Sequence, residues 1–387
     1  MAVESGTVVG GLGSEPARGT GAAVEDGTPG IAWDDGLECW VVSDPALARI
    51  VLKHRGFSSR TSDRSTELYM TEQSRREYRE LVEFLRLWFV HTDGVEHAAF
   101  RKPVQRLFSA SFTRSLAGVV ERLVDECLDD LWADSGHDAV PTLAEGLSAR
   151  VMAHLVGVEE EPVVLHGWSR TLSAFIAAMY RRDHAEAATR VMREMTAALQ
   201  GSPALAAFPR DTPADRARTT ATWAMLLFGG LETTASLLGS CLLAVLTDRE
   251  QWERVAGERP GEVEALVESV LERRPPLRNI GRVMAEDLLF HGAELRRGDL
   301  VLVSLAAGGL FDAEVPGIAE SSGPGDRHLT FGFGAHYCVG APLVRLEAAT
   351  MLRRFVRRFP DASVAGDGAE WGENLAYVGL DHLRLVL

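Results

Sequence analysis

The chain has 387 residues, a formal net charge of −15, and a hydrophobic share of 46%, which is enough for a sizeable core. Length alone would allow two or three domains of ~150 residues. The acidic balance argues against nucleic acid as a partner, because phosphate contacts need a basic face. Four scattered cysteines make no disulfide framework and indicate a reducing compartment. No apolar leader and no run of about 18 apolar residues is visible, so we expect a cytoplasmic protein without a membrane anchor.

Residues 1–30 are rich in Gly, Ala, Ser and Thr, which predicts a mobile tail, and residues 31–387 are expected to form one domain. A short strand is expected from Cys39, followed by a helical run that ends near Gly56. Residues 112–134 carry apolar side chains at helical spacing. Cys127 lies on that apolar stripe, so we interpret it as core packing.

The stretch from Asp215 to Leu246 has no internal proline and is apolar on nearly every face of a helix, which predicts a long central helix. Further helices are expected near 248–257, 261–272 and 342–359, and short strands near 288–303 and 375–387. No repeat and no clear linker divides the chain. The sequence therefore predicts a mostly α protein with small β-sheets.

The segment FGFGAHYCVG, residues 331–340, is the most specific pattern in the chain. It places Cys338 in a turn punctuated by Gly332, Gly334 and Gly340, just before an expected helix. The glycines allow the loop to lie flat beneath a large planar cofactor, and the helix N-terminus favours thiolate over thiol. Such a thiolate is the iron ligand of one haem class. A zinc site is disfavoured, because no CxxC or HxxxH spacing exists.

The longer segment FGFGAHYCVGAPLVRLE closely resembles the haem-binding loop of the cytochrome P450 family. The resemblance extends over nearly the whole chain after residue 30. It implies the cytochrome P450 fold, with haem b as cofactor and Cys338 as its axial iron ligand. It also implies that Phe331 and Gly340 of the loop, and Gly229 of the central helix, contact the cofactor.

The central helix contains LFGGLETTA, residues 227–235. Two consecutive glycines in a helix interior cost roughly 1 kcal/mol each, so they indicate a packing or functional need. Thr233 lies four residues after Gly229, and its hydroxyl can reach the carbonyl of that residue. The segment matches the family's oxygen-activation motif, which implies Glu232 as the acid and Thr233 as the alcohol of a proton relay for O–O cleavage. A surface carboxylate or a structural ion pair is the alternative for Glu232.

Haem carries two propionates, which need cationic or donor groups when they are partly buried. His97 and Arg101 share a helix face and resemble the family's propionate-binding pair. Arg282 and His336 match two further propionate positions. Any one of them could be an ordinary surface residue, but their order along the chain implies that all four hold the propionates.

One family feature, an E-x-x-R motif before the Pro-Pro pair at 275–276, is missing. The usual spacing places Ser269 and Glu272 in its two positions, and a frame that starts at Glu268 places Leu271 in the arginine position. The partner arginine expected before the haem loop is missing as well. We interpret the ion-pair network as lost in both halves, a change that can be nearly neutral for stability.

These features predict a haem-thiolate monooxygenase that uses O2 and a ferredoxin-type electron donor. It would hydroxylate, epoxidise or oxidatively couple a small organic molecule, as in bacterial specialised metabolism and antibiotic biosynthesis. Two alternatives remain: a peroxygenase, dehydratase or isomerase without an external donor, and a non-catalytic scaffold of the same fold that activates a partner enzyme. Arginines in segment 60–92 would fit an anionic or carrier-tethered substrate, and equally a solvated loop. Arginines in the expected helix 342–359 could dock an acidic electron donor.

Overall fold

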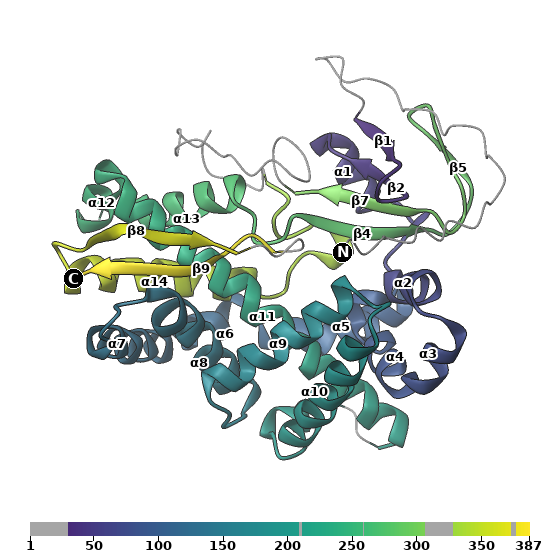
Figure 1. The fold of residues 1–387 in the computed structure, drawn as a ribbon, viewed down its shortest axis with the longest axis horizontal. Helices are drawn as coiled ribbons and strands as arrows, with labels where there is room; N and C mark the ends of the chain where they lie inside the picture. Colours follow the sequence, from purple (N-terminus) through teal and green to yellow (C-terminus); the bar gives the residue numbers. More distant parts are fainter. Residues whose placement is uncertain (1–29, 209–210, 258, 306–327, 373–376) are drawn as a thin grey trace, which may run out of the picture.

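The computed structural model describes residues 30–387 except 209–210, 258, 306–327 and 373–376. The expected tail, residues 1–30, lies outside the described residues apart from Gly30. Helices make up most of the described chain, and small sheets lie toward opposite ends of the long axis (Figure 1). The expectation of a mostly α protein with small β-sheets is therefore confirmed.

Four short helices come first along the chain, and most of the longer helices follow from α5 onward. The helices are α1 (Pro45–Val51), α2 (Thr61–Tyr69), α3 (Glu72–Glu77), α4 (Arg79–Arg86), α5 (Gly94–Leu107), α6 (Ala110–Ser115), α7 (Ala117–Ala133), α8 (Glu145–Val156), α9 (Pro162–Ala177), α10 (Arg182–Gln200), α11 (Pro213–Thr247), α12 (Arg249–Ala256), α13 (Glu262–Arg273) and α14 (Ala341–Arg358). Short 3-10 turns lie at η1 (Phe89–His91), η3 (Pro203–Ala207) and η4 (Gly334–His336), and a π-turn, η2 (Val140–Ala144), leads into α8.

The strands form a mixed sheet and two hairpins. The mixed sheet has the order β1-β2-β7-β4-β3, in which β2 and β7 run parallel and the other neighbours antiparallel. Its strands are β1 (Ile31–Asp34), β2 (Cys39–Val42), β3 (Phe57–Ser58), β4 (Asn279–Met284) and β7 (Leu300–Ser304). The hairpins pair β5 (Leu288–Phe290) with β6 (Ala293–Leu295), and β8 (Ser363–Trp371) with β9 (Leu380–Val386).

The long helix α11 runs through the middle of the molecule (Figure 1). It starts at a capping box, in which the Thr212 hydroxyl accepts from the Asp215 N–H and the Asp215 carboxylate accepts from the Thr212 N–H, with Pro213 in the first turn. Its length and composition would suffice to cross a membrane. However, 67% of its most apolar window is buried inside the protein, as expected of the core helix of a large protein.

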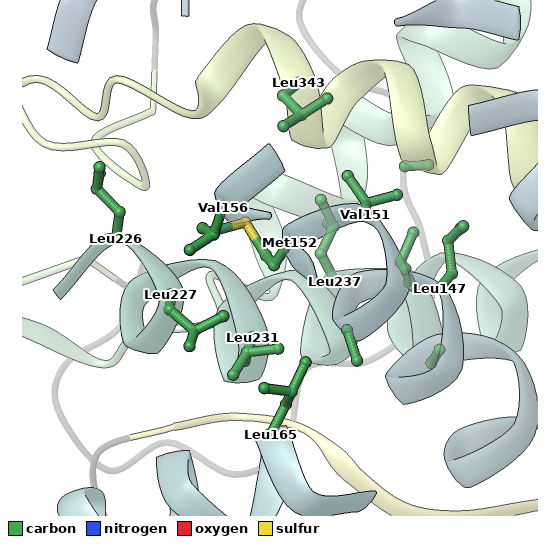
Figure 2. Close-up of a cluster of buried hydrophobic side chains, with 14 of the residues drawn as sticks. Leu147, Val151, Met152, Val156, Leu165, Leu226, Leu227, Leu231, Leu237 and Leu343 are labelled. Atoms are coloured by element: carbon green, nitrogen blue, oxygen red, sulfur yellow. The ribbon is translucent and has the colours of Figure 1, made fainter. Parts of the chain in front are cut away.

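The main hydrophobic core lies between α11 and the helices around it, and a second core lies under the mixed sheet. Figure 2 shows part of the main core, where Leu147, Val151 and Met152 of α8 gather with Leu227 and Leu231 of α11. This packing fixes the position of α11. The glycines in its middle are therefore held at a defined place in the fold.

Candidate active site

The cysteine loop, residues 331–340, is a turn held by its own backbone. The Cys338 N–H donates to the Phe331 carbonyl over 2.8 Å. Gly332 and Gly334 have φ of 71° and 76°, values that residues with a side chain rarely adopt. The loop therefore fixes the sulfur through backbone geometry, as the sequence predicts.

The electrostatic surroundings of Cys338 differ from those of the other cysteines, because Cys338 is exposed and the other three are buried. Burial of the surrounding loop raises the pKa of its thiol, whereas hydrogen bonds from the Gly340 and Ala341 N–H groups lower it. The positive charges of Arg101 and Arg345 also lower it, but burial is the larger effect and the pKa of the thiol stays above its ordinary value. The sulfur thus meets the N-terminal end of α14, which begins at Ala341 and whose amide N–H groups are the local feature that favours the thiolate form.

The four residues predicted to hold propionates meet in space, and we call them the cationic cluster: His97, Arg101, Arg282 and His336. The imidazole rings of His97 and His336 stack with centroids 3.9 Å apart. Arg101 donates to the carbonyl of Tyr337, beside the cysteine. The structure therefore brings together groups from α5, β4 and the cysteine loop, although α5 and the loop are 236 positions apart at Arg101 and Tyr337.

The cationic cluster has more hydrogen-bond donors than its described surroundings satisfy. His97 Nε2 is buried without a partner, and Arg282 donates to the Gly281 carbonyl but pairs with no carboxylate of the described residues. Asp93 lies 4.0 Å from His336 Nε2, with its oxygens already bonded elsewhere. Burial, followed by the nearby cations, lowers the pKa of His336 to about 3, and burial lowers that of Arg282 to about 10. An orphaned donor and an unpaired guanidinium fit the two carboxylates of a haem.

The two glycines of α11 have different surroundings. A Cβ at Gly229 would meet no atom within 4 Å, and this residue is exposed in the middle of a mostly buried helix. A Cβ at Gly230 would lie 2.5 Å from the sulfur of Met152 on α8. Gly230 therefore serves helix packing, whereas Gly229 leaves the helix backbone open to a ligand.

The hydroxyl of Thr233 donates to the Gly229 carbonyl over 2.7 Å, the contact that the sequence spacing predicts. Its neighbour Thr234 is buried and faces the core. Glu232 is turned toward α9, where its Oε1 lies 3.4 Å from His166 Nδ1. The acid and the alcohol are thus adjacent on α11, and the acid has a partner that the sequence analysis did not name.

His166 could have been noticed as a polar residue within the apolar face of 162–177. The side chain is 1% exposed, among the buried Leu165, Trp168 and Ser169. A buried histidine needs partners for both ring nitrogens. The sequence did not show that α9 would place His166 against Glu232 of α11, because these two residues are 66 positions apart.

Glu268, which precedes Ser269 in the region of the missing motif, forms an ion pair with a residue of α14. Glu268 of α13 bonds Arg345 of α14 through both oxygens, at 2.5 and 2.9 Å, and lies 3.3 Å from His328 Nε2. Although burial alone would raise the pKa of Glu268, the hydrogen bonds from Arg345 and His328 lower it to about 2. Leu271, in the arginine position, is buried. Glu268 therefore joins α13 to α14, whereas the loss of the E-x-x-R motif stays a prediction, because the partner arginine position before the cysteine loop falls outside the described residues.

The arginines of α14 do not form a free basic patch. Arg353 pairs with Glu264, Arg354 with Asp125, and Arg358 with Asp129. Pairs of this kind neutralise the field that would attract an acidic protein. The sequence showed the cations of one helix but not the acids that α7 and α13 place opposite them.

Comparison with known proteins places these features in context, although no family model matches the sequence. The chain is 29% identical over 374 residues to "Cytochrome P450 monooxygenase PikC" of Streptomyces venezuelae, covering 91% of this chain and 86% of the relative. It is 26% identical over 323 residues to "Polyketide biosynthesis cytochrome P450 PksS" of Bacillus subtilis, covering 79% of each. Among solved structures, the tirandamycin C-bound P450 monooxygenase TamI has a TM-score of 0.76 at 26% identity, over 90% of both chains. The described fold is the fold of these proteins.

Proposed function

Because this chain belongs to the cytochrome P450 family and is a cytochrome P450 monooxygenase, we propose that it oxidises a small organic molecule in bacterial specialised metabolism. The names of two similar proteins, a polyketide biosynthesis P450 and a P450 solved with tirandamycin C, support this metabolic role. The reaction would be hydroxylation, epoxidation or oxidative coupling, in the cytoplasm, with electrons from a ferredoxin-type donor. Residues 31–387 would act as one haem-thiolate domain.

The observation that carries the proposal is the pairing of an exposed cysteine at a helix N-terminus with an unsatisfied cationic cluster. Haem b, when bound, supplies the iron at which O2 is activated. Cys338 would ligate that iron, and Phe331 and Gly340 would line the loop side of the cofactor. His97 and Arg282 lead the set that would bind the propionates, together with the rest of the cationic cluster.

On the opposite side, we assign proton handling to α11. Gly229 would leave room for O2 and water against the helix backbone, because nothing in the described protein fills that space. Thr233 holds its hydroxyl at the Gly229 carbonyl, where it can orient a water and pass on a proton. Glu232 would supply that proton.

The substrate is proposed to be uncharged where it meets segment 60–92. Arginines of this segment already have partners: Arg60 pairs with Glu96, Arg86 with Asp63, and Arg76 with Glu72. Arg75 donates to main-chain carbonyls, including those of Thr66 and Glu67. An anionic group on the substrate would have to compete with these contacts, which disfavours the anionic option.

The proposal is tested by the absorption spectrum of the reduced protein under carbon monoxide. A strongly red-shifted, thiolate-type band is expected in the wild type and in a Cys39→Ala control, since Cys39 is buried in the mixed sheet. Cys338→His should bind haem and give a band of the neutral-ligand type. A wild type without haem, or a wild-type band that Cys338→His leaves unchanged, would overturn the assignment.

Turnover assays separate the remaining alternatives. The presence of Glu232 beside Thr233 favours O2 as the oxidant, because a proton relay would have no task with peroxide. Product formed with a reduced ferredoxin and O2, and abolished without the donor, supports the monooxygenase. Product formed only with peroxide would favour the peroxygenase, and a partner enzyme activated equally by Cys338→Ala would favour the scaffold.

A further inference from the structure

The buried contact between His166 and Glu232 ties α9 to α11. Glu232 Oε1 lies 3.4 Å from His166 Nδ1, and the side chain of Glu232 is 18% exposed whereas that of His166 is 1% exposed. The other ring nitrogen, Nε2, lies 3.1 Å from the Glu145 carbonyl and 3.1 Å from the Ser148 hydroxyl. Both nitrogens of one histidine are thus engaged, on opposite sides, by groups of two other helices.

The partners of Nε2 decide where the proton of the ring lies. A backbone carbonyl only accepts hydrogen bonds, so the contact with Glu145 requires an N–H at Nε2. The hydroxyl of Ser148 itself donates to the same Glu145 carbonyl, over 3.1 Å, and therefore has its lone pairs free for Nε2–H. The ring is thus placed to donate from Nε2 to the Glu145 carbonyl, with the Ser148 hydroxyl as a second partner.

The number of protons between His166 Nδ1 and Glu232 Oε1 follows from this arrangement. With Nε2 carrying a hydrogen, Nδ1 and Glu232 Oε1 can bond only if one proton lies between them. Either Nδ1 carries it, as imidazolium beside carboxylate, or Oε1 carries it, as carboxylic acid beside neutral imidazole. The pair therefore stores one transferable proton in both arrangements.

Charged groups of α8, α9 and β9 lie around the pair. Arg170 on α9 pairs with the Glu145 carboxylate, and it also interacts with Glu232 and with Asp381 of β9. Tyr377 faces Glu232 as well, and its pKa is raised to about 12, by burial first and by the carboxylate in addition, so it stays neutral. The surroundings thus place one fixed cation, Arg170, among three carboxylates.

We propose that His166 is a positioning residue that stores a proton for Glu232 and returns the carboxyl group to its protonated form after each delivery. In the transfer, the N–H bond at Nδ1 breaks and an O–H bond at Oε1 forms, leaving neutral imidazole and a carboxylic acid beside Thr233. After the acid has given up its proton, solvent reprotonates the pair through Glu232, its more exposed member. This inference rests on the proposed function of Glu232.

The test that does not depend on turnover is 15N NMR of histidine-labelled, haem-loaded protein in its diamagnetic ferrous carbon monoxide form. Near neutral pH we expect Nε2 of His166 to be protonated and Nδ1 to show a shared or bound proton. In Glu232→Gln, Nδ1 should become an unprotonated nitrogen. The control is His184 of α10, whose Nδ1 lies 2.9 Å from the Ala174 carbonyl of α9 and which should be unchanged. An unprotonated Nε2, or an Nδ1 signal that Glu232→Gln does not move, would overturn the proposal.

A second variant separates proton storage from simple support. In His166→Gln the amide can still donate to Glu232 but cannot carry an extra proton. We expect product per O2 consumed to fall several-fold on the alkaline side of the wild-type optimum and to approach the wild type in acid. A pH profile parallel to that of the wild type would show a structural role only and would overturn the proposal. Because the carbon monoxide band reports haem ligation independently, failure of this inference is distinguishable from failure of the proposed function.

Discussion

Thr233 is the residue for which loss of a single hydroxyl should be most informative. Its hydroxyl bonds the Gly229 carbonyl, and a valine of the same shape would keep the packing while removing the proton carrier. We expect Thr233→Val to lower product formed per donor oxidised by on the order of 10²-fold, as for loss of a general acid–base group. The measurement is the ratio of product formed to electron donor oxidised, compared between Thr233→Val and the wild type.

The neighbouring Thr234 is the matched control, because it is buried and faces the core. Thr234→Val should retain most of the product yield. Equal loss in both variants would mean that the helix geometry, and not the Thr233 hydroxyl, controls the yield.

At this scale the sequence identified residues whose role depends on local spacing. Cys338 lies within its own loop and Thr233 lies one helical turn from Gly229, so both contacts follow from positions close in the chain. The partners of Glu232 and Glu268 come from 66 and 77 residues away, and no local pattern could indicate them. Each long-range partner depends on which helices meet, and that is decided by the packing of the whole core.

Gly229 and Gly230, in the middle of α11, have different surroundings, and we expect opposite effects on stability when each is replaced by alanine. Gly230→Ala would force a methyl group against Met152, with an overpacking cost of roughly 1–3 kcal/mol. Gly229→Ala meets nothing and should gain up to about 1 kcal/mol of helix propensity. The midpoint of urea unfolding should therefore fall for Gly230→Ala and hold or rise for Gly229→Ala.

For binding of haem and carbon monoxide we expect the reverse order: Gly229→Ala should be impaired more than Gly230→Ala. The methyl group of Gly229→Ala would occupy the open face of α11, so its haem content or its affinity for carbon monoxide should drop. If Gly229→Ala bound haem and carbon monoxide like the wild type, the open face would not be the ligand face.

A second prediction concerns the connection between α13 and α14. Folding lowers the pKa of Glu268 to about 2, so its contribution to stability is present above its ordinary value near 4.5 and is lost as pH falls toward 2. Glu268→Gln should cost roughly 1.5–3 kcal/mol at pH 7, the range for a hydrogen bond to a charged group. Thermal unfolding at several pH values should show the variant and the wild type converging in acid.

Glu272, one turn later in α13, provides the control for that experiment. It forms no ion pair within the part of the chain that the structure describes, so Glu272→Gln should follow the wild-type pH dependence. A Glu268→Gln variant whose stability ran parallel to the wild type down to pH 2 would contradict the assignment.

Elements with a strong periodic pattern were predicted well, and weakly patterned elements were not. The central helix was expected from Asp215 to Leu246 and is found at Pro213–Thr247. The expected single helix over 112–134 is found as two helices, α6 and α7. Leu116 is the C-terminal cap of α6 and the N-terminal cap of α7. Strand β8 was missed because its sequence, SVAGDGAEW, contains two glycines and little alternation.

For the whole molecule, the distribution of paired charges predicts which basic groups an electron donor can sense. Arg354 is neutralised by Asp125, whereas Lys102 on α5 is exposed and forms no ion pair among the described residues. Arg354→Ala should change the apparent KM for an acidic ferredoxin less than about two-fold. Lys102→Ala should raise that KM more and weaken its dependence on salt, because unpaired charge governs association.

Steady-state kinetics over a range of ionic strength would make this comparison. A larger effect of Arg354→Ala than of Lys102→Ala would mean that the donor breaks the Arg354–Asp125 pair when it docks. The charged residues were visible in the sequence, but their neutralisation arises only when α7 and α14 come together.

The unsatisfied cationic cluster also has a consequence for the steady-state amount of the protein in a cell. His97 Nε2 has no partner among the described residues and the buried Arg282 forms no ion pair there, so a ligand that bonds both stabilises the native state by mass action, by about 4 kcal/mol at a thousand times its Kd. Chains that wait for haem would spend more time open to proteases than chains that contain it. We therefore expect the steady-state amount of this protein to follow the haem supply of its host, with degradation removing whatever part the cofactor does not fill.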